Sequence, residues 1–123
     1  MKNVLIVEDS KAIRSMIRVS LEEAGGFFAV EAGNGFEALK NLPTRRFDLI
    51  ITDINMPDIN GLELIGFVKS NPAYKDLPLI IVSTEKSDED KKRGMALGAS
   101  GYVVKPFTRE ELMAAVKNVL EGK

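Results

Sequence analysis

Short apolar segments alternate with amphipathic segments along the chain, and this alternation constrains the fold more than any other feature. Residues 4–7 and 49–52 are almost wholly apolar on successive positions, which is typical of strands buried on both faces of a parallel sheet. Residues 27–30, 79–82 and 102–104 are further strand candidates. Because a helix candidate follows each of them, we expect a doubly wound five-stranded parallel sheet with helices on both faces.

The helix candidates carry their own sequence signals. Thr108 and Glu111 have the spacing of a capping box, and the apolar residues after them recur at helical spacing. Residues 88–93 place acids before bases, which complements a helix dipole, although Gly94 predicts that this helix is marginal. No linker, repeat or low-complexity tract interrupts the pattern, so residues 1–123 are expected to form one domain.

Composition excludes several classes of function. The net charge of −1 provides no basic field for nucleic acid. The chain has no apolar run long enough to cross a bilayer and no cleavable signal segment, so we expect no membrane insertion. Cysteine and histidine are both absent, which excludes thiol and Ser-His catalysis. The absence of cysteine also fits a reducing cytoplasm, where we expect the protein to work.

Three carboxylates follow the two most apolar strand candidates. Glu8 and Asp9 come after residues 4–7, and Asp53 comes after residues 49–52. In the strand order 2-1-3-4-5 the first and third strands are neighbours, so these acids would lie roughly 5 Å apart at the carboxyl edge of the sheet. Two unit charges about 4 Å apart repel by about 4 kcal/mol at an effective dielectric constant of about 20. We therefore expect a cation among them.

Two other strand candidates end in groups suited to binding phosphate. Ser83 and Thr84 follow residues 79–82, and Lys105 follows residues 102–104. A lysine supplies a point charge for phosphate, and a hydroxyl supplies a hydrogen-bond donor. Oxygen ligands without nitrogen or sulfur favour Mg²⁺, which proteins bind through one or two carboxylates together with water and phosphate. The four strand ends together predict a site for a phosphoryl group and Mg²⁺.

Asp53 is the better candidate nucleophile among the acids, because a carboxylate can accept a phosphoryl group as an acyl phosphate. It ends the central strand and precedes a loop that contains Pro57 and Gly61, which would leave it accessible. A cis bond between Lys105 and Pro106 could aim the lysine over the site, and the residues leave that isomer open.

Over its whole length the chain resembles the receiver domain of bacterial two-component response regulators. The matching residues are Val7-Glu8-Asp9-Ser10, Asp53-Ile54-Asn55-Met56-Pro57, Gly61, Ser83, Gly98-Ala99 and Tyr102-Val103-Val104-Lys105-Pro106-Phe107. The resemblance implies the flavodoxin/CheY-like (βα)5 fold and a signalling protein that catalyses only its own phosphorylation and dephosphorylation. It also implies that Asp53 is the phosphoacceptor.

The resemblance implies a metal site as well. Asp9, Asp53 and the backbone carbonyl of Asn55 would bind Mg²⁺, and Glu8 would assist through water. Glu8 stands where many members carry aspartate, and its extra methylene changes how it reaches that water.

A switch is implied by the same resemblance. Ser83 would contact the phosphoryl group and Lys105 would pair with it. Tyr102 would turn inward when Ser83 moves, and the response is expected on the face of the fourth helix, fifth strand and fifth helix. Thr84 stands where many members have a smaller residue, so it could slow access to the site.

The expected partners are a sensor histidine kinase and a downstream protein. Asn55 and Glu85 are similar to the pair that accompanies short-lived phosphorylation in chemotaxis CheY proteins, which favours chemotaxis or motility control and a target such as a flagellar switch component. Because the chain ends at Lys123, just after the last helix, we expect no output domain within it.

Three alternatives stay open at this stage. A phosphorelay intermediate would pass the phosphoryl group on to a phosphotransfer protein. A haloacid-dehalogenase-type phosphatase would want a second aspartate two residues after the nucleophile, where this chain has Asn55. A non-phosphorylated scaffold with the same fold would have no need for the complete site.

Overall fold

The computed structural model describes residues 1–56, 59–84 and 88–121, and within them the strands form one parallel sheet. The strands are β1 (Lys2–Val7), β2 (Phe27–Ala32), β3 (Leu49–Asp53), β4 (Leu79–Thr84) and β5 (Gly101–Lys105). Their order is β2-β1-β3-β4-β5, which confirms the predicted topology.

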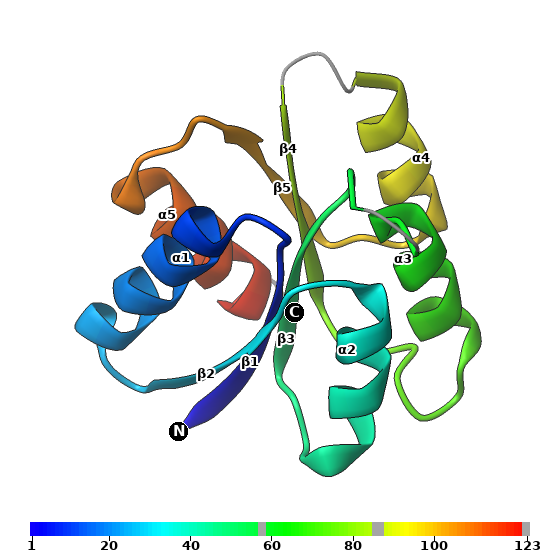
Figure 1. The fold of residues 1–123 in the computed structure, drawn as a ribbon, viewed down its shortest axis with the longest axis horizontal. Coiled ribbons are helices and arrows are strands. Elements are labelled where there is room, and N and C mark those ends of the chain that lie inside the picture. Colours follow the sequence, from blue (N-terminus) through cyan, green and yellow to red (C-terminus); the bar gives the residue numbers. More distant parts are fainter. Residues whose placement is uncertain (57–58, 85–87, 122–123) are drawn as a thin grey trace.

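Helices cover both faces of the sheet (Figure 1). The helices are α1 (Lys11–Ala24), α2 (Gly35–Asn41), α3 (Gly61–Ser70), α4 (Asp88–Leu97) and α5 (Arg109–Glu121), with a 3₁₀ turn η1 (Leu42–Thr44) after α2. In Figure 1, α1 and α5 lie on one side of the sheet and α2, α3 and α4 on the other.

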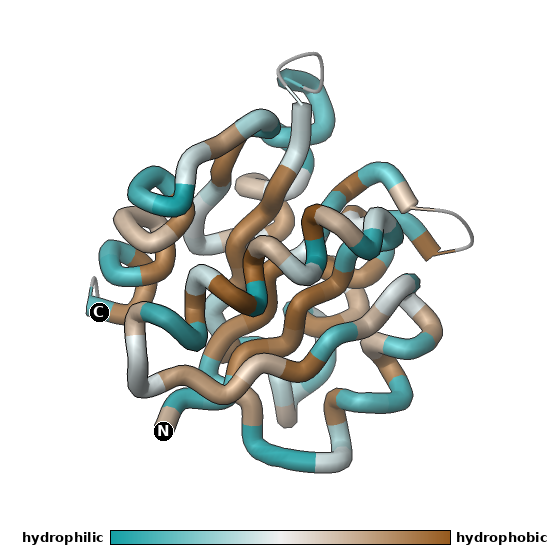
Figure 2. The backbone as a smooth tube through the Cα atoms, turned by 60° about the vertical axis from the view of Figure 1, so that its left-hand side comes forward, coloured by the Kyte–Doolittle hydropathy of each residue, from teal (hydrophilic) through white to brown (hydrophobic). Residues whose placement is uncertain are grey.

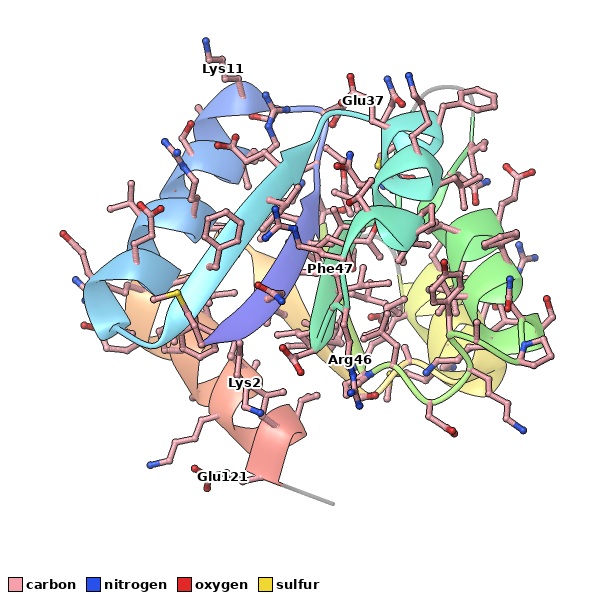
Figure 3. All side chains as sticks on the ribbon, turned by 90° about the horizontal axis from the view of Figure 1, so that it is seen from below. Lys2, Lys11, Glu37, Arg46, Phe47 and Glu121 are labelled. Carbon is pink, nitrogen blue, oxygen red and sulfur yellow. The ribbon has the colours of Figure 1, made fainter. Side chains whose placement is uncertain are left out.

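The buried side chains form two clusters, one on each face of the sheet. Successive residues of β1 belong to opposite clusters. Leu5 packs toward α2 and α3, whereas Val4 packs toward α1 and α5. Figure 2 shows the strands as the hydrophobic centre of the molecule, and Figure 3 shows charged side chains such as Lys11 and Glu121 pointing outward. This two-sided burial explains the apolar runs in the sequence.

The helix signals behave largely as predicted. The Thr108 hydroxyl accepts from the backbone N–H of Glu111, and the Glu111 carboxylate accepts from the N–H of Thr108, so the predicted capping box is confirmed. Asn60 and Glu63 form a second box at the start of α3. α4 continues through Gly94, which is buried, and a Cβ there would clash with Ile81. Gly94 therefore permits close packing of α4 on β4.

Strand register places the polar strand ends at one edge of the sheet. Val7 pairs with Thr52, so the next residues along β1 and β3 are Glu8 and Asp53. Ser83 of β4 pairs with Val104, which immediately precedes Lys105 of β5. None of the helices in the described ranges is long and apolar enough to cross a membrane.

Candidate functional site

The three carboxylates predicted to converge do lie together. One ligand oxygen from each of Glu8, Asp9 and Asp53 lies within 4.8 Å of the others. Glu8 is 1% exposed and Asp53 is 5% exposed, whereas Asp9 lies at the exposed side of the cluster. The convergence follows from parallel topology, because the carboxyl ends of β1 and β3 meet at one edge.

Lys105 joins this cluster from the end of β5. Its ammonium nitrogen lies 2.8 Å from Oε1 of Glu8 and 3.5 Å from Oδ1 of Asp53. The Lys105–Pro106 peptide bond, which the sequence left open, is cis. Three carboxylates thus face one ammonium, and the cluster keeps two formal negative charges that a divalent cation would neutralise.

Burial and charge shift the pKa of each buried member. Loss of solvent raises the pKa of the Glu8 carboxyl, and the charge of Asp53 adds to this, although hydrogen bonds from Lys105 and from the N–H of Ser10 oppose it. Burial likewise raises the pKa of Asp53. Burial acts to lower the pKa of Lys105, but the hydrogen bond to Glu8 and the negative charges around it prevail and raise it.

Ser83 carries a buried hydroxyl at the same edge of the sheet, near the end of β4. It is 1% exposed, and its Oγ has no hydrogen-bond partner among the described residues. A buried polar group without a partner costs about 1–3 kcal/mol, so such groups need an explanation. A phosphoryl oxygen bound beside Asp53 would supply the missing acceptor. The neighbouring Thr84 is exposed at the end of β4.

The loop after β3 is held close to Asp53. The backbone N–H of Asn55 donates to the Asp53 carboxylate, while the Asn55 residue itself is exposed. The N–H of Gly61 donates to the carbonyl of Ile54 at 2.8 Å, and a Cβ at Gly61 would clash with the carbonyl oxygen of Asp53. Gly61 therefore lets the loop fold back onto the strand end. Glu85 and Pro57, which the sequence singled out, lie outside the described residues.

Tyr102 lies on the same face of the sheet as Ser83. It pairs with Ile81, two residues before Ser83, and packs in part against the buried cluster on the side of α2 and α3. The ammonium of Lys91, on α4, lies 3.7 Å from the centre of the Tyr102 ring. The ring is thus half-buried beneath a cation on α4.

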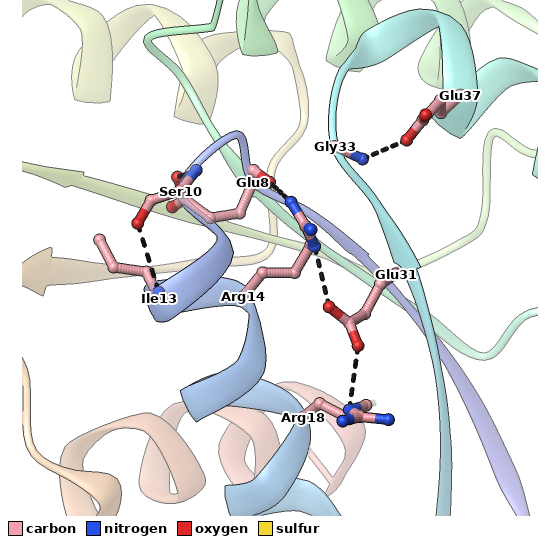
Figure 4. A network of polar contacts seen from close by, with 8 residues as sticks. All are labelled: Glu8, Ser10, Ile13, Arg14, Arg18, Glu31, Gly33 and Glu37. Atoms are coloured by element: carbon pink, nitrogen blue, oxygen red, sulfur yellow. Dashed lines mark hydrogen bonds and ion pairs between the residues drawn. The ribbon is translucent and has the colours of Figure 1, made fainter.

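An arginine network behind Glu8 was missed by sequence reasoning (Figure 4). Arg14 of α1 donates through Nη1 to the backbone carbonyl of Glu8, and through Nε to the carboxylate of Glu31 on β2, both at 2.8 Å. Arg18 pairs with the other oxygen of Glu31 at 3.0 Å. The two arginines stand one helical turn apart, but spacing alone gave no signal that Glu31 would lie opposite them.

Comparison with known proteins agrees with the fold. The response regulator receiver domain family matches residues 4–117, and the chain belongs to this family. It is a receiver domain of the CheY-like type, with chemotaxis proteins among its relatives.

The chain matches some relatives over nearly their whole length and others over only part of it. A chemotaxis protein CheY homologue of Campylobacter jejuni is 38% identical over 119 residues, covering 95% of this chain and 91% of the relative. The phosphate regulon transcriptional regulatory protein PhoB of Pseudomonas aeruginosa is also 38% identical, over 97% of this chain, and the chain spans only 52% of it. The structure of the Vibrio cholerae chemotaxis protein CheY4 superimposes with a TM-score of 0.90 at 42% identity, covering 98% of this chain and 99% of that one.

Proposed function

We propose that this protein accepts a phosphoryl group on Asp53 from a sensor histidine kinase, in a Mg²⁺-dependent reaction, and signals by the resulting change of conformation. One observation carries the proposal. The buried Asp53 carboxylate lies beside two further acids, within 3.5 Å of the Lys105 ammonium, at the strand edge where Ser83 presents a hydroxyl with no partner among the described residues.

The residues fit a magnesium ion. Glu8, Asp9, Asp53 and the backbone carbonyl of Asn55 offer only oxygen, which is the ligand type that Mg²⁺ prefers. The two uncompensated negative charges match a divalent cation. When bound, Mg²⁺ would offset the charge on the phosphoryl oxygens.

The chain's own groups divide the remaining work. An Asp53 carboxylate oxygen forms the new O–P bond, the P–N bond of the kinase phosphohistidine breaks, and its electron pair returns to the imidazole. Lys105 already lies within reach of Asp53, so it can pair with the phosphoryl group as charge develops there. Ser83 donates its free hydroxyl to a phosphoryl oxygen.

The conformational response is proposed to run through Ser83 and Tyr102. Ser83 and Tyr102 lie on the same face of the sheet. Movement of Ser83 toward the phosphoryl group would leave space beside it on that face, and the Tyr102 ring would turn inward to fill this space. Lys91 links this ring to α4, so the face of α4, β5 and α5 would present a different surface to a partner. Phosphorylation should change amide exchange in α4 and β5, and unchanged exchange there would contradict this part of the proposal.

The proposed output is control of chemotaxis or motility through protein contact, with a flagellar switch component as the type of target. Support comes from the relatives, since a CheY homologue and CheY4 are both named as chemotaxis proteins and both match nearly end to end. Phosphorylation-dependent binding to a flagellar switch protein would favour this output. Reversible transfer to a histidine phosphotransfer protein would favour a phosphorelay instead.

The direct test is incubation with a small acyl phosphate and Mg²⁺, followed by intact-mass measurement. The wild-type protein should gain the mass of one phosphoryl group, and chelation of the metal should prevent the gain. Asp53→Asn should stay unlabelled, whereas Asp76→Asn, which changes an exposed aspartate in the loop before β4, should label as wild type does. Labelling of Asp53→Asn would overturn the assignment of the phosphoacceptor.

A further inference from the structure

Arg14 makes a connection that the proposed reaction does not itself require. The side chain is 17% exposed, and its guanidinium bridges two segments that are far apart in sequence. Nη1 donates to the backbone carbonyl of Glu8, at the point where β1 ends and the acidic pair Glu8-Asp9 begins. Nε donates to Glu31 near the end of the neighbouring strand β2. The guanidinium therefore ties the metal-binding corner of β1 to β2 (Figure 4).

The surroundings hold this guanidinium in one place. Glu31 accepts a hydrogen bond from Arg14 on one oxygen, and Nε of Arg18 lies 3.0 Å from the other oxygen as an ion pair, so both oxygens of the carboxylate face an arginine. Gly33, just after β2, lies beside the guanidinium, since a Cβ there would make an ordinary van der Waals contact with Nη1 of Arg14 at 3.5 Å. A planar guanidinium with two donors in fixed directions suits this geometry, whereas a lysine ammonium does not reproduce it.

From this geometry we infer that Arg14 is a positioning residue for the metal site, with Glu31 holding Arg14 in place. This inference rests on the proposed function, because it concerns Mg²⁺ binding at Glu8, Asp9 and Asp53. Among the described residues, the hydrogen bonds of Arg14 go to the backbone carbonyl of Glu8 and to Glu31, and none is found to a carboxylate of the cluster. Arg14 acts on the backbone from which the Glu8 and Asp9 side chains project, and so sets where their oxygens lie.

The direction in which Mg²⁺ affinity changes when Arg14 is replaced distinguishes positioning of the ligands from a purely electrostatic effect. Arg14 is a positive charge near a cation site, so removing it should strengthen Mg²⁺ binding if only its field matters. If Arg14 positions the ligands, removing it should weaken Mg²⁺ binding instead. Groups that hold metal ligands in place commonly change metal affinity by about 10- to 100-fold, and we expect about tenfold for Arg14→Gln.

Arg18 provides a matched control. It pairs with the same Glu31 carboxylate as Arg14 and carries the same charge, and no contact of Arg18 with Glu8 is found in the described part of the chain. Arg18→Gln should leave Mg²⁺ affinity unchanged or slightly raised. Arg14→Lys keeps the charge and changes only the geometry, so its affinity should fall between those of wild type and Arg14→Gln.

The experiment is an NMR titration of the metal-free protein with Mg²⁺, following the amide signals of Asp9 and Asp53 in all variants. Weaker binding by Arg14→Gln than by Arg18→Gln supports the inference. Equal or tighter binding by Arg14→Gln overturns it, and if that variant does not fold, wild-type affinity in Arg14→Lys overturns it. Absence of Mg²⁺ binding in the wild type would remove the proposed function as well, so the two failures are distinguishable.

Discussion

The Lys105 ammonium lies closer to the carboxylate of Glu8 than to that of Asp53, at 2.8 Å against 3.5 Å. The lysine that we propose as a phosphate partner is therefore already engaged by an acid proposed to support the metal. If the acids bind Mg²⁺ as proposed, Glu8 would gain a second cation near it and its attraction for Lys105 would weaken. We therefore expect metal binding to favour movement of Lys105 toward Asp53.

The pH dependence of the metal-free protein should reflect the raised pKa values of Glu8 and Asp53. A carboxyl whose folded pKa is raised contributes stability that is full below its unfolded pKa of about 4 and is lost as pH rises through the folded value. The free energy of unfolding in chelator should thus fall as the pH rises above about 4, until both folded carboxyls are ionised. Lys105 adds no slope in that window, because its raised pKa places its titration at alkaline pH.

Asp53→Asn isolates this effect. The variant removes one of the buried charges, so in chelator at neutral pH it should be more stable than wild type by on the order of 1 kcal/mol. The gain should shrink as the pH falls, because the raised pKa lets protonation neutralise wild-type Asp53 at higher pH than an ordinary aspartate. Urea unfolding of both proteins across this range measures the difference, and a gain that is equal at every pH would contradict the electrostatic explanation.

Gly61→Ala should destabilise the protein, because a Cβ at this position meets the carbonyl oxygen of Asp53 and the loop must move. Forcing extra atoms into a tight site typically costs about 1–3 kcal/mol. Gly66→Ala is the control within the same helix, since a Cβ there has no heavy atom within 4 Å. It should stabilise by about 0.5–1 kcal/mol through helix propensity. Equal unfolding free energies for the two variants would show that Gly61 is replaceable.

Much of the site could be predicted from sequence because parallel topology brings strand ends together wherever the strands lie. Glu8, Asp53 and Lys105 each follow an apolar run, so their convergence needed no knowledge of side-chain contacts. Register was different. Which of Glu8 and Asp9 would be buried depends on the pairing of Val7 with Thr52, a long-range choice that the local pattern does not contain.

The residues that support the site could not be predicted from the sequence, because their roles also depend on long-range contacts. Arg14 is one of several charged residues on α1, and its importance comes from Glu31, which is 17 positions away. Gly94 gave only a local signal, because its low helix propensity predicts a marginal helix and says nothing of its neighbours. The structure adds a contact with β4, since a Cβ at Gly94 would force the Cδ1 methyl of Ile81 to move. Local propensity predicts where helices and strands form, but it does not predict which side chains pack against them.

Lys91→Gln should weaken the contact between α4 and Tyr102. A cation over an aromatic ring at an accessible site contributes about 0.5–1 kcal/mol, so the free energy of unfolding should fall by about that amount. Lys92→Gln, at the exposed neighbouring position, should have little effect. In a Tyr102→Leu background, Lys91→Gln should cost nothing further, because the ring is gone. Full additivity in this double-mutant cycle would exclude a Lys91–Tyr102 interaction.

Ser83→Ala should separate stability from function. The Ser83 hydroxyl is buried without a hydrogen-bond partner among the described residues, so replacing it with a methyl group removes an unsatisfied polar group. The metal-free variant should be as stable as wild type or more stable, by up to about 1 kcal/mol. Its phosphorylation by an acyl phosphate should nevertheless slow by about 100-fold, the scale seen when a donor to a developing oxyanion is lost.

Ser20 offers the contrasting case for that measurement. It is also buried, but its hydroxyl donates to the carbonyl of Met16 at 2.8 Å within α1. Ser20→Ala should leave the phosphorylation rate unchanged and give no gain in stability, because its hydroxyl is already satisfied. If Ser83→Ala instead behaves like Ser20→Ala in both measurements, Ser83 is an ordinary core hydroxyl. A stable but slow Ser83→Ala protein means that the hydroxyl is kept for the phosphoryl group.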